Sequence, residues 1–116
     1  MEDYEKIFIE DIIVIGVNLS RSTLLESKEF RKIIEEEIGY GHNRLIIDLS
    51  KCEIIDSTFF GVIIMTLKKL NEAGGTLKVV EPANPIEDIF TITNTLRIFD
   101  LYKTREDAIK SFKGDS

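Results

Sequence analysis

The stretch LIIDLS (residues 45–50) is an apolar run. After three intervening residues, IIDSTFFG (residues 54–61) begins an amphipathic segment. The first run predicts a buried strand, and the second predicts the beginning of a helix. Asp56-Ser57-Thr58 lies at the joint, so the Ser57 hydroxyl is expected at the helix N-terminus. The leading N–H groups of a helix lack intrahelical partners, and its dipole favours negative charge there. We therefore regard Ser57 as a candidate phosphate-carrying switch in a protein that binds other proteins.

The composition is that of one globular domain. Of the 116 residues, 43% are hydrophobic and 31% are charged, which is ordinary globular usage. A chain of this length can bury a core without disulfides or metals. We expect a single domain over residues 1–116, with frayed ends at residues 1–5 and 113–116. The net charge of −6 weighs against a nucleic-acid-binding protein, which normally carries a basic patch.

The side chains that carry most catalytic and metal chemistry are scarce. The chain has one cysteine, Cys52, and one histidine, His42, which lies in a glycine-rich turn. We therefore predict no enzyme, no metal and no cofactor. A lone cysteine fits a reducing cytoplasm. The longest apolar run, residues 59–65, is too short to span a membrane, and the acidic N-terminus does not resemble a signal peptide. We expect a cytoplasmic protein that binds neither membrane nor nucleic acid.

Hydrophobic periodicity predicts alternating strands and helices. The expected class is α/β, with a mixed, mostly parallel sheet of four to five strands, about four helices, and the order β-β-α-β-α-β-α-β-α. Strands are expected at residues 7–9, 12–17, 45–49, 76–80 and 96–99, with residues 54–55 continuing or resuming the third, and helices at residues 23–38, 58–72, 85–94 and 104–112.

Apolar residues at three- and four-residue spacings predict the buried faces of the first two helices. The expected core residues are Leu24, Phe30, Ile33, Ile34 and Ile38 in the first helix, and Phe60, Ile63, Ile64, Leu67 and Leu70 in the second.

From residue 45 onward the sequence resembles the STAS domain family, named for sulphate transporters and anti-sigma factor antagonists. Family members typically show a strand ending in Asp-Leu-Ser, then an apolar pair, Asp-Ser-Ser or Asp-Ser-Thr, Gly-Leu-Gly and an apolar helix. This chain has Asp48-Leu49-Ser50, then Ile54-Ile55-Asp56-Ser57-Thr58, Phe59-Phe60-Gly61 and Val62-Ile63-Ile64. Farther on, Ala73-Gly74-Gly75 and residues 93–99 (TNTLRIF) are similar to family patterns.

The resemblance implies an anti-sigma factor antagonist that works by partner switching. Ser57 would be the residue phosphorylated by a partner serine kinase, with Thr58 as a secondary candidate. The unphosphorylated protein would bind an anti-sigma factor, often itself that kinase, and so free a sigma factor. Phosphorylation would break the complex and a serine phosphatase would reset it. The implied partner-binding residues are Asp56, Ser57, Thr58, Phe59, Asn18 and Ser20.

Two positions depart from the family pattern. Phe59 stands where a glycine usually follows the second hydroxyl residue, and we expect it to be partly exposed beside a buried Phe60, where it packs on a partner or hinders a kinase. The region after the second strand, Gly16 to Ser20, lacks the acidic residue often found near the phosphorylation site.

Three alternatives differ from the phosphoswitch. A constitutive STAS binding module would keep the fold without phosphorylation, and the sequence does not separate it from the switch. A phosphoacceptor receiver domain would use Asp48 with the acidic pair Glu10-Asp11 around Mg²⁺, but the predicted order of elements disfavours it. A hydrolase would have to rest on Asp48, Asp56 and Ser57 alone.

Overall fold

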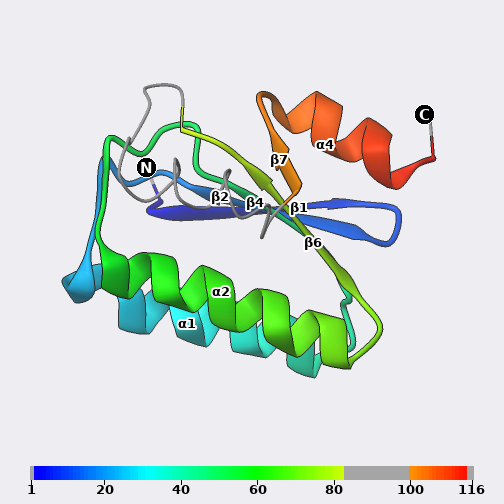
Figure 1. Ribbon diagram of the computed structural model, residues 1–116, viewed down its shortest axis with the longest axis horizontal. Helices are drawn as coiled ribbons and strands as arrows, with labels where there is room; N and C mark the ends of the chain where they lie inside the picture. The colour runs from blue at the N-terminus through cyan, green and yellow to red at the C-terminus, as the bar shows by residue number, and fades with distance from the viewer. Residues whose placement is uncertain (1, 83–99, 115–116) are drawn as a thin grey trace.

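A mixed sheet in the order β1-β2-β4-β6-β7 runs through the molecule (Figure 1). The computed structural model describes residues 2–82 and 100–114. β1 is antiparallel to β2, and the other neighbouring pairs are parallel. Helices α1 and α2 cover one face and α4 covers the other. The bounds are β1 Tyr4–Ile9, β2 Ile12–Val17, α1 Leu24–Gly39, β4 Arg44–Asp48, α2 Ser57–Glu72, β6 Thr76–Val80, β7 Asp100–Tyr102 and α4 Arg105–Phe112.

The central strands are buried on both faces, which explains their continuous apolar runs. In β2, Ile13 and Ile15 belong to the core under α1 and α2, whereas Ile12 and Val14 belong to the core under α4. The strand β4 divides its side chains between the two cores in the same alternating way. The predicted α/β class and the mixed, mostly parallel sheet are therefore confirmed.

The order of elements was predicted incompletely. A second, two-stranded sheet pairs β3 (Arg21–Ser22) in parallel with β5 (Ile54–Ile55), so residues 54–55 do not continue β4. Among the described residues there are three helices. The predicted helix at residues 85–94 and the predicted strand at residues 96–99 lie outside the described residues, and the last described strand is β7.

The ends of the helices follow local sequence signals. Glu26 accepts hydrogen bonds from the backbone N–H and the hydroxyl of Thr23, both at 2.8 Å, at the start of α1. At the start of α4, Thr104 Oγ1 accepts from the backbone N–H of Asp107 at 3.1 Å, which is the N-cap half of the predicted capping box. After α2, a Cβ on Gly75 would lie 2.4 Å from the carbonyl oxygen of Asn43, so only glycine fits this close approach.

Two predictions about exposure near the helix starts are wrong. Leu24, predicted in the core, is 63% exposed because it is the first residue of α1 and lies at the end of the helix pair rather than over the sheet (Figure 1). Phe59, predicted to be partly exposed, is fully buried. At the N-terminus of the chain, Tyr4 and Glu5 lie within the range that was expected to fray. They belong to β1 and pair with Val17 and Gly16.

Candidate functional site

The starts of α1 and α2 share one capping side chain. Asp56 is the N-cap of α2, with extended backbone angles (φ −90°, ψ 174°). Its Oδ1 accepts a hydrogen bond from the backbone N–H of Phe59 at 2.9 Å. Its Oδ2 accepts one from the backbone N–H of Leu24, the first residue of α1, also at 2.9 Å. A single carboxylate thus satisfies an N–H group at the start of each helix.

Ser57 and Thr58 form the exposed start of α2. Ser57 is the first helical residue, and both side chains are exposed. Among the described residues, neither hydroxyl forms a hydrogen bond. The Ser57 hydroxyl therefore lies at the start of the helix, as the sequence predicts, while Asp56 does the capping. No base within the described residues is hydrogen-bonded to the Ser57 hydroxyl, so the described part of the chain shows no serine-base pair of the kind that hydrolases use.

Backbone hydrogen bonds hold the segment that leads into Ser57 against the loop after β2. The carbonyl oxygen of Ser20 accepts from the N–H groups of Glu53 at 2.8 Å and Ile54 at 2.9 Å. The carbonyl oxygen of Ser22 accepts from the N–H of Asp56 at 3.1 Å. This pairing continues the β3–β5 ribbon, so the two loops are joined immediately before α2.

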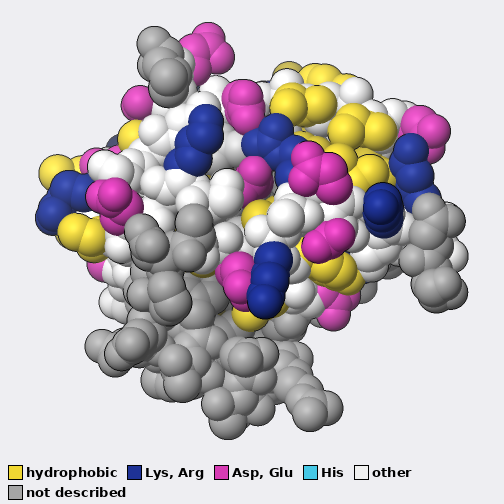
Figure 2. All heavy atoms as spheres, turned by 90° about the horizontal axis from the view of Figure 1, so that it is seen from above, with side chains coloured by type: hydrophobic (Ala, Val, Ile, Leu, Met, Phe, Trp, Pro, Cys, Tyr) yellow, Lys and Arg dark blue, Asp and Glu magenta, His cyan; other side chains and the backbone are white. Residues whose placement is uncertain are grey.

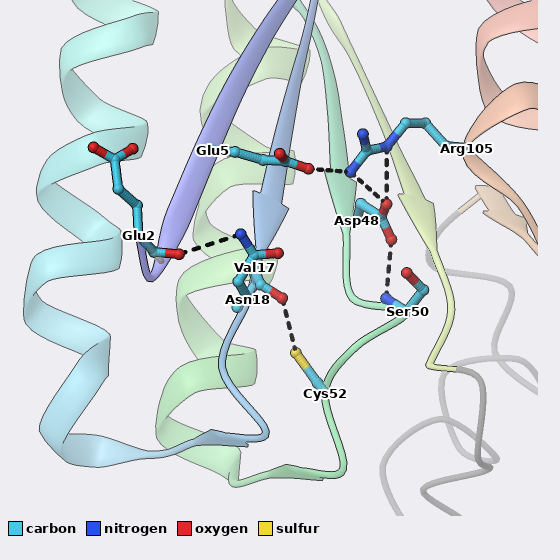
Figure 3. A network of polar contacts seen from close by, with 8 residues as sticks. All are labelled: Glu2, Glu5, Val17, Asn18, Asp48, Ser50, Cys52 and Arg105. Carbon is cyan, nitrogen blue, oxygen red and sulfur yellow. Dashed lines mark hydrogen bonds and ion pairs between the residues drawn. The ribbon is translucent and has the colours of Figure 1, made fainter.

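Asn18 and Ser20, in the loop after β2, were predicted to bind a partner. Ser20 lies where this loop bonds to the segment before α2, and Asn18 is turned toward the N-terminal segment. The Ser20 side chain is exposed. Asn18 Nδ2 donates to the carbonyl oxygen of Glu2 at 3.2 Å, and its backbone N–H donates to that of Asp3 at 2.8 Å (Figure 3). The structure therefore brings Ser20 to the segment before Ser57 and gives Asn18 a bond within the chain.

Phe59 supports the site from inside. Its ring is stacked on Phe30 of α1, with centroids 4.4 Å apart and planes 8° apart, and Phe30 is stacked in turn on Tyr4. A side chain with no exposed surface cannot contact a partner in this conformation, so the expected contact between Phe59 and a partner is not available. Phe59, which stands where the family pattern usually has glycine, packs instead in the core between the two helices.

A partly buried ion network lies at the end of β4 and was not predicted. Arg105, at the start of α4, reaches Asp48 Oδ2 with Nε at 2.9 Å and with Nη2 at 2.8 Å, and its Nη2 also lies 2.8 Å from Glu5 Oε1 (Figure 3). Asp48 Oδ1 accepts from the backbone N–H of Ser50 at 2.9 Å. Burial of Arg105 lowers its pKa, but the bonds to Glu5 and Asp48 outweigh burial and raise it. The network joins β1 and α4 to the chain that leads toward Ser57.

Cys52 and His42 do not form a catalytic pair. His42 precedes β4 and Cys52 follows it, so they lie at opposite ends of that strand. Cys52 is buried, with its Sγ 3.5 Å from Ser22 Oγ and 3.9 Å from the carbonyl oxygen of Val17. Burial raises the pKa of the Cys52 thiol to about 11, and so keeps it protonated and unreactive at neutral pH.

The arrangement of acidic residues does not fit a receiver domain. Asp48 pairs with Gly16 at the end of β2, whereas Glu10 and Asp11 form the turn before β2 begins. Asp11 instead pairs with Arg44, at the start of β4, at 3.1 Å. The acidic pair is therefore separated from Asp48 by the length of the sheet, and the three carboxylates cannot share one Mg²⁺ ion.

The surface chemistry of the described residues is mixed. Lysine and arginine side chains are interspersed with aspartate and glutamate on the face that carries α4, without an extended basic patch on that face (Figure 2). Residues 2–82 and 100–114 contain no cluster of three His, Cys, Asp or Glu side chains that could hold a metal ion. In the same residues no helix has the length and apolar character needed to cross a membrane.

Comparison with known proteins places this geometry in a family. The STAS domain family matches residues 9–108. A Thermotoga neapolitana protein, provisionally named an anti-sigma factor antagonist, is 31% identical over 107 residues, which cover 91% of this chain and 94% of the relative.

Solved structures show the same fold. The crystal structure of a provisionally named anti-sigma factor antagonist from Thermotoga maritima superposes with a TM-score of 0.84 at 28% identity, covering 93% of this chain and 92% of the other. The phosphorylated form of SpoIIAA from Bacillus superposes with a TM-score of 0.73, covering 94% of this chain and 98% of the other. At 16% identity the second likeness shows a shared fold only.

Proposed function

The chain belongs to the STAS domain family, and we propose that it is an anti-sigma factor antagonist switched off by phosphorylation at Ser57. In this proposal the unphosphorylated protein binds an anti-sigma factor that is also a serine kinase, and so frees a sigma factor in the cytoplasm. Phosphorylation by that kinase ends the complex, and a serine phosphatase restores the binding form. The role is one of binding rather than catalysis.

The observation that carries this proposal is the exposed hydroxyl of Ser57 at the first position of α2. A kinase needs an accessible hydroxyl, and the helix N-terminus tolerates the added negative charge. Asp56 already engages N–H groups of both helices, so the domain can stay folded when Ser57 is modified. The named relatives give the proposal its partner class, since proteins similar over most of this chain are provisionally named anti-sigma factor antagonists.

The same geometry gives a reason for the complex to break. A phosphate adds about −1.5 to −2 charges and three strong acceptors beside the Asp56 carboxylate. A partner surface that fits the neutral hydroxyl would then meet two adjacent anionic groups. A loss of about 3–4 kcal/mol would weaken binding by a few hundredfold. We propose that Asp56, Thr58, Ser20 and Asn18 line the same contact.

Mass spectrometry tests this function directly. The protein is mixed with ATP, Mg²⁺ and the candidate anti-sigma kinase from the same genome, and peptides are then mapped. We expect one phosphate on the wild type and none on Ser57→Ala. Thr58→Ala is the matched control: it removes the neighbouring exposed hydroxyl but keeps that of Ser57, and should still receive one phosphate.

Binding to the same kinase completes the test. Ser57→Ala should still bind, and Ser57→Asp should bind more weakly, although one carboxylate imitates a dianion poorly. A stable complex with no phosphate, and with equal affinity for Ser57→Asp, would instead identify a constitutive binding module.

A further inference from the structure

The outer surface next to Ser57 differs in chemistry from the rest of the helix pair. Residues 57–67 of α2 contain no charged side chain. On α1, by contrast, the exposed positions are mostly charged. These are Lys28, Glu29, Arg31, Lys32, Glu35 and Glu36. Only Ser57, Thr58 and Gly61 of residues 57–67 are exposed, so the accessible surface beside Ser57 is narrow and uncharged.

Within residues 2–82 and 100–114, no contact requires glycine at position 61. It is exposed in the interior of α2, where glycine is among the least favourable residues. Its φ is not positive, and a Cβ there would meet no described atom within 4 Å. By contrast, a Cβ on Gly75 would collide with Asn43. A glycine that the fold does not require, at a cost in helix stability, points to close approach by something outside the chain.

Exposed apolar side chains lie at the same end of the molecule. Leu24 is 63% exposed and Leu25 is 85% exposed at the start of α1, and Ile54 is 44% exposed just before Asp56. The hydrogen bond from the Leu24 backbone N–H to the Asp56 carboxylate holds the start of α1 beside the start of α2.

Leu24 and Gly61 lie on the same outer side of the helix pair. Arg31, two turns after Leu24 on α1, places its Nη2 3.0 Å from the Sδ of Met65 on α2. Met65 is one turn after Gly61, and Gly61 is one turn after Ser57. Residues four apart are neighbours on one helix face, so Ser57, Gly61 and Met65 form a row beside the row that contains Leu24 and Arg31.

We propose that the anti-sigma factor packs an apolar segment against Leu24, Leu25 and Gly61, with Gly61 at the point of closest approach. This inference rests on the proposed function and names the surface through which it acts. A partner that is sensitive to a phosphate on Ser57 must lie close to its hydroxyl, and the next residue along that exposed face is Gly61. The phosphate would then sit at the edge of an apolar contact, where it would have to lose water without gaining a partner.

The experiment compares full-length variants for binding to the same purified anti-sigma kinase by titration calorimetry. Gly61→Ala should raise the midpoint of thermal unfolding by about 2–5 °C, because alanine favours the helix. The same substitution should weaken binding at least about tenfold, which corresponds to about 1.4 kcal/mol. Gain of stability with loss of affinity is a combination that a merely structural role for Gly61 does not produce.

Matched controls lie at the opposite end of the helices. Gly39, the last residue of α1, also has open space at the Cβ position, so Gly39→Ala should not reduce stability or affinity. A second test variant at the proposed surface, Leu25→Ala, should weaken binding without loss of stability. Its control is Tyr40→Ala, which changes a side chain that is 73% exposed at the opposite end of α1 and should leave binding unchanged.

The outcomes separate the inference from the proposed function. Wild-type affinity in both Gly61→Ala and Leu25→Ala would overturn the inference while leaving the antagonist function standing. Failure of the wild type to bind the kinase would overturn both. Self-association of the wild type that Gly61→Ala abolishes would assign the surface to a second copy of this chain and would also overturn the inference.

Discussion

The carboxylate of Asp56 lies 2.9 Å from the backbone nitrogen of Leu24, so the residue that caps α2 also holds the first residue of α1. The two helix starts, and Ser57 beside them, are therefore fixed relative to one another by one side chain. If Ser57 is the switch, as we propose, this shared cap would let its modification change the surface rather than the fold.

Removal of this shared cap should destabilise the domain. Asp56→Ala loses the bonds to both Leu24 and Phe59, and we expect a loss of about 2 kcal/mol in the free energy of unfolding. Asp56→Asn keeps one acceptor oxygen and should lose about half as much. Urea unfolding measures both, and Glu53→Ala, at an exposed neighbouring carboxylate, should stay within about 0.5 kcal/mol of wild type. Equal stability of Asp56→Ala and wild type would show that the double cap contributes nothing.

Phe59 should matter for stability and not for partner contact. Phe59→Ala opens a cavity beside Phe30 and should cost about 3–5 kcal/mol, which is a large part of the stability of a small domain. Phe59→Leu refills most of that space and should cost about 1 kcal/mol. We therefore expect Phe59→Leu to remain folded and to bind the anti-sigma kinase with wild-type affinity in calorimetry. Strongly weakened binding by this folded variant would mean that Phe59 leaves the core when the complex forms.

The sequence predicted the features that depend on neighbouring residues. The runs at residues 12–17 and 45–49 are almost continuously apolar, interrupted only by Gly16 and Asp48, and this identifies the central strands. The Asp56-Ser57-Thr58 motif located the start of α2 to within one residue. Helix starts and buried strands are recognisable because their physical causes lie within a few positions along the chain.

The sequence did not predict features that depend on distant contacts. Arg105 bonds to Asp48 and Glu5, which lie 57 and 100 positions earlier in the sequence. No local sequence pattern predicts such a network. The burial of Phe59 depends on Phe30 of another helix, and periodicity alone could not show that both adjacent phenylalanines, Phe59 and Phe60, are buried. The exposure of Leu24 likewise depends on where the helix ends relative to the sheet.

The Arg105 network should be a strong link between α4 and the sheet. Arg105→Ala leaves Asp48, whose side chain is 8% exposed, without its cation, and we expect a loss of about 3 kcal/mol in the free energy of unfolding. A double-mutant cycle with Asp48→Asn should give a coupling of at least about 1 kcal/mol. Lys113→Ala, in a more exposed pair with Glu10 at 3.9 Å, is the matched control and should change stability little.

A simpler test of the same network uses Gly16. A Cβ at this position would lie 2.8 Å from both Cγ and Oε1 of Glu5 and 3.0 Å from Nη2 of Arg105. Gly16→Ala should therefore displace the Glu5 side chain and destabilise the domain by about 1–3 kcal/mol. The loss should be smaller in an Arg105→Ala background, because the bond that it disturbs is already gone. Equal losses in the two backgrounds would show that Gly16 does not act through the network.

The buried thiol of Cys52 should make stability fall in alkaline solution. Burial raises its pKa from an ordinary value of 9.0 to about 11, so the folded state keeps a proton that the unfolded state loses. Below pH 9 this contribution is fully present, and it is lost as the pH rises toward 11. We expect a loss of about 1 kcal/mol between pH 8 and pH 10 in urea unfolding, and a total of about 2–3 kcal/mol at higher pH. Cys52→Ala should lack this part of the pH dependence.

Tyr4 sets the upper limit of this test, because burial raises the pKa of its phenol as well and adds a similar loss above pH 10. The informative window therefore lies between pH 8 and pH 10, because an ordinary tyrosine loses most of its protons only above its pKa of about 10. In that window the difference in slope between wild type and Cys52→Ala isolates the thiol, since the two proteins differ only at this side chain. Parallel slopes would mean that Cys52 is solvated in the native state, and rapid alkylation of the folded protein at pH 8 would support the same conclusion.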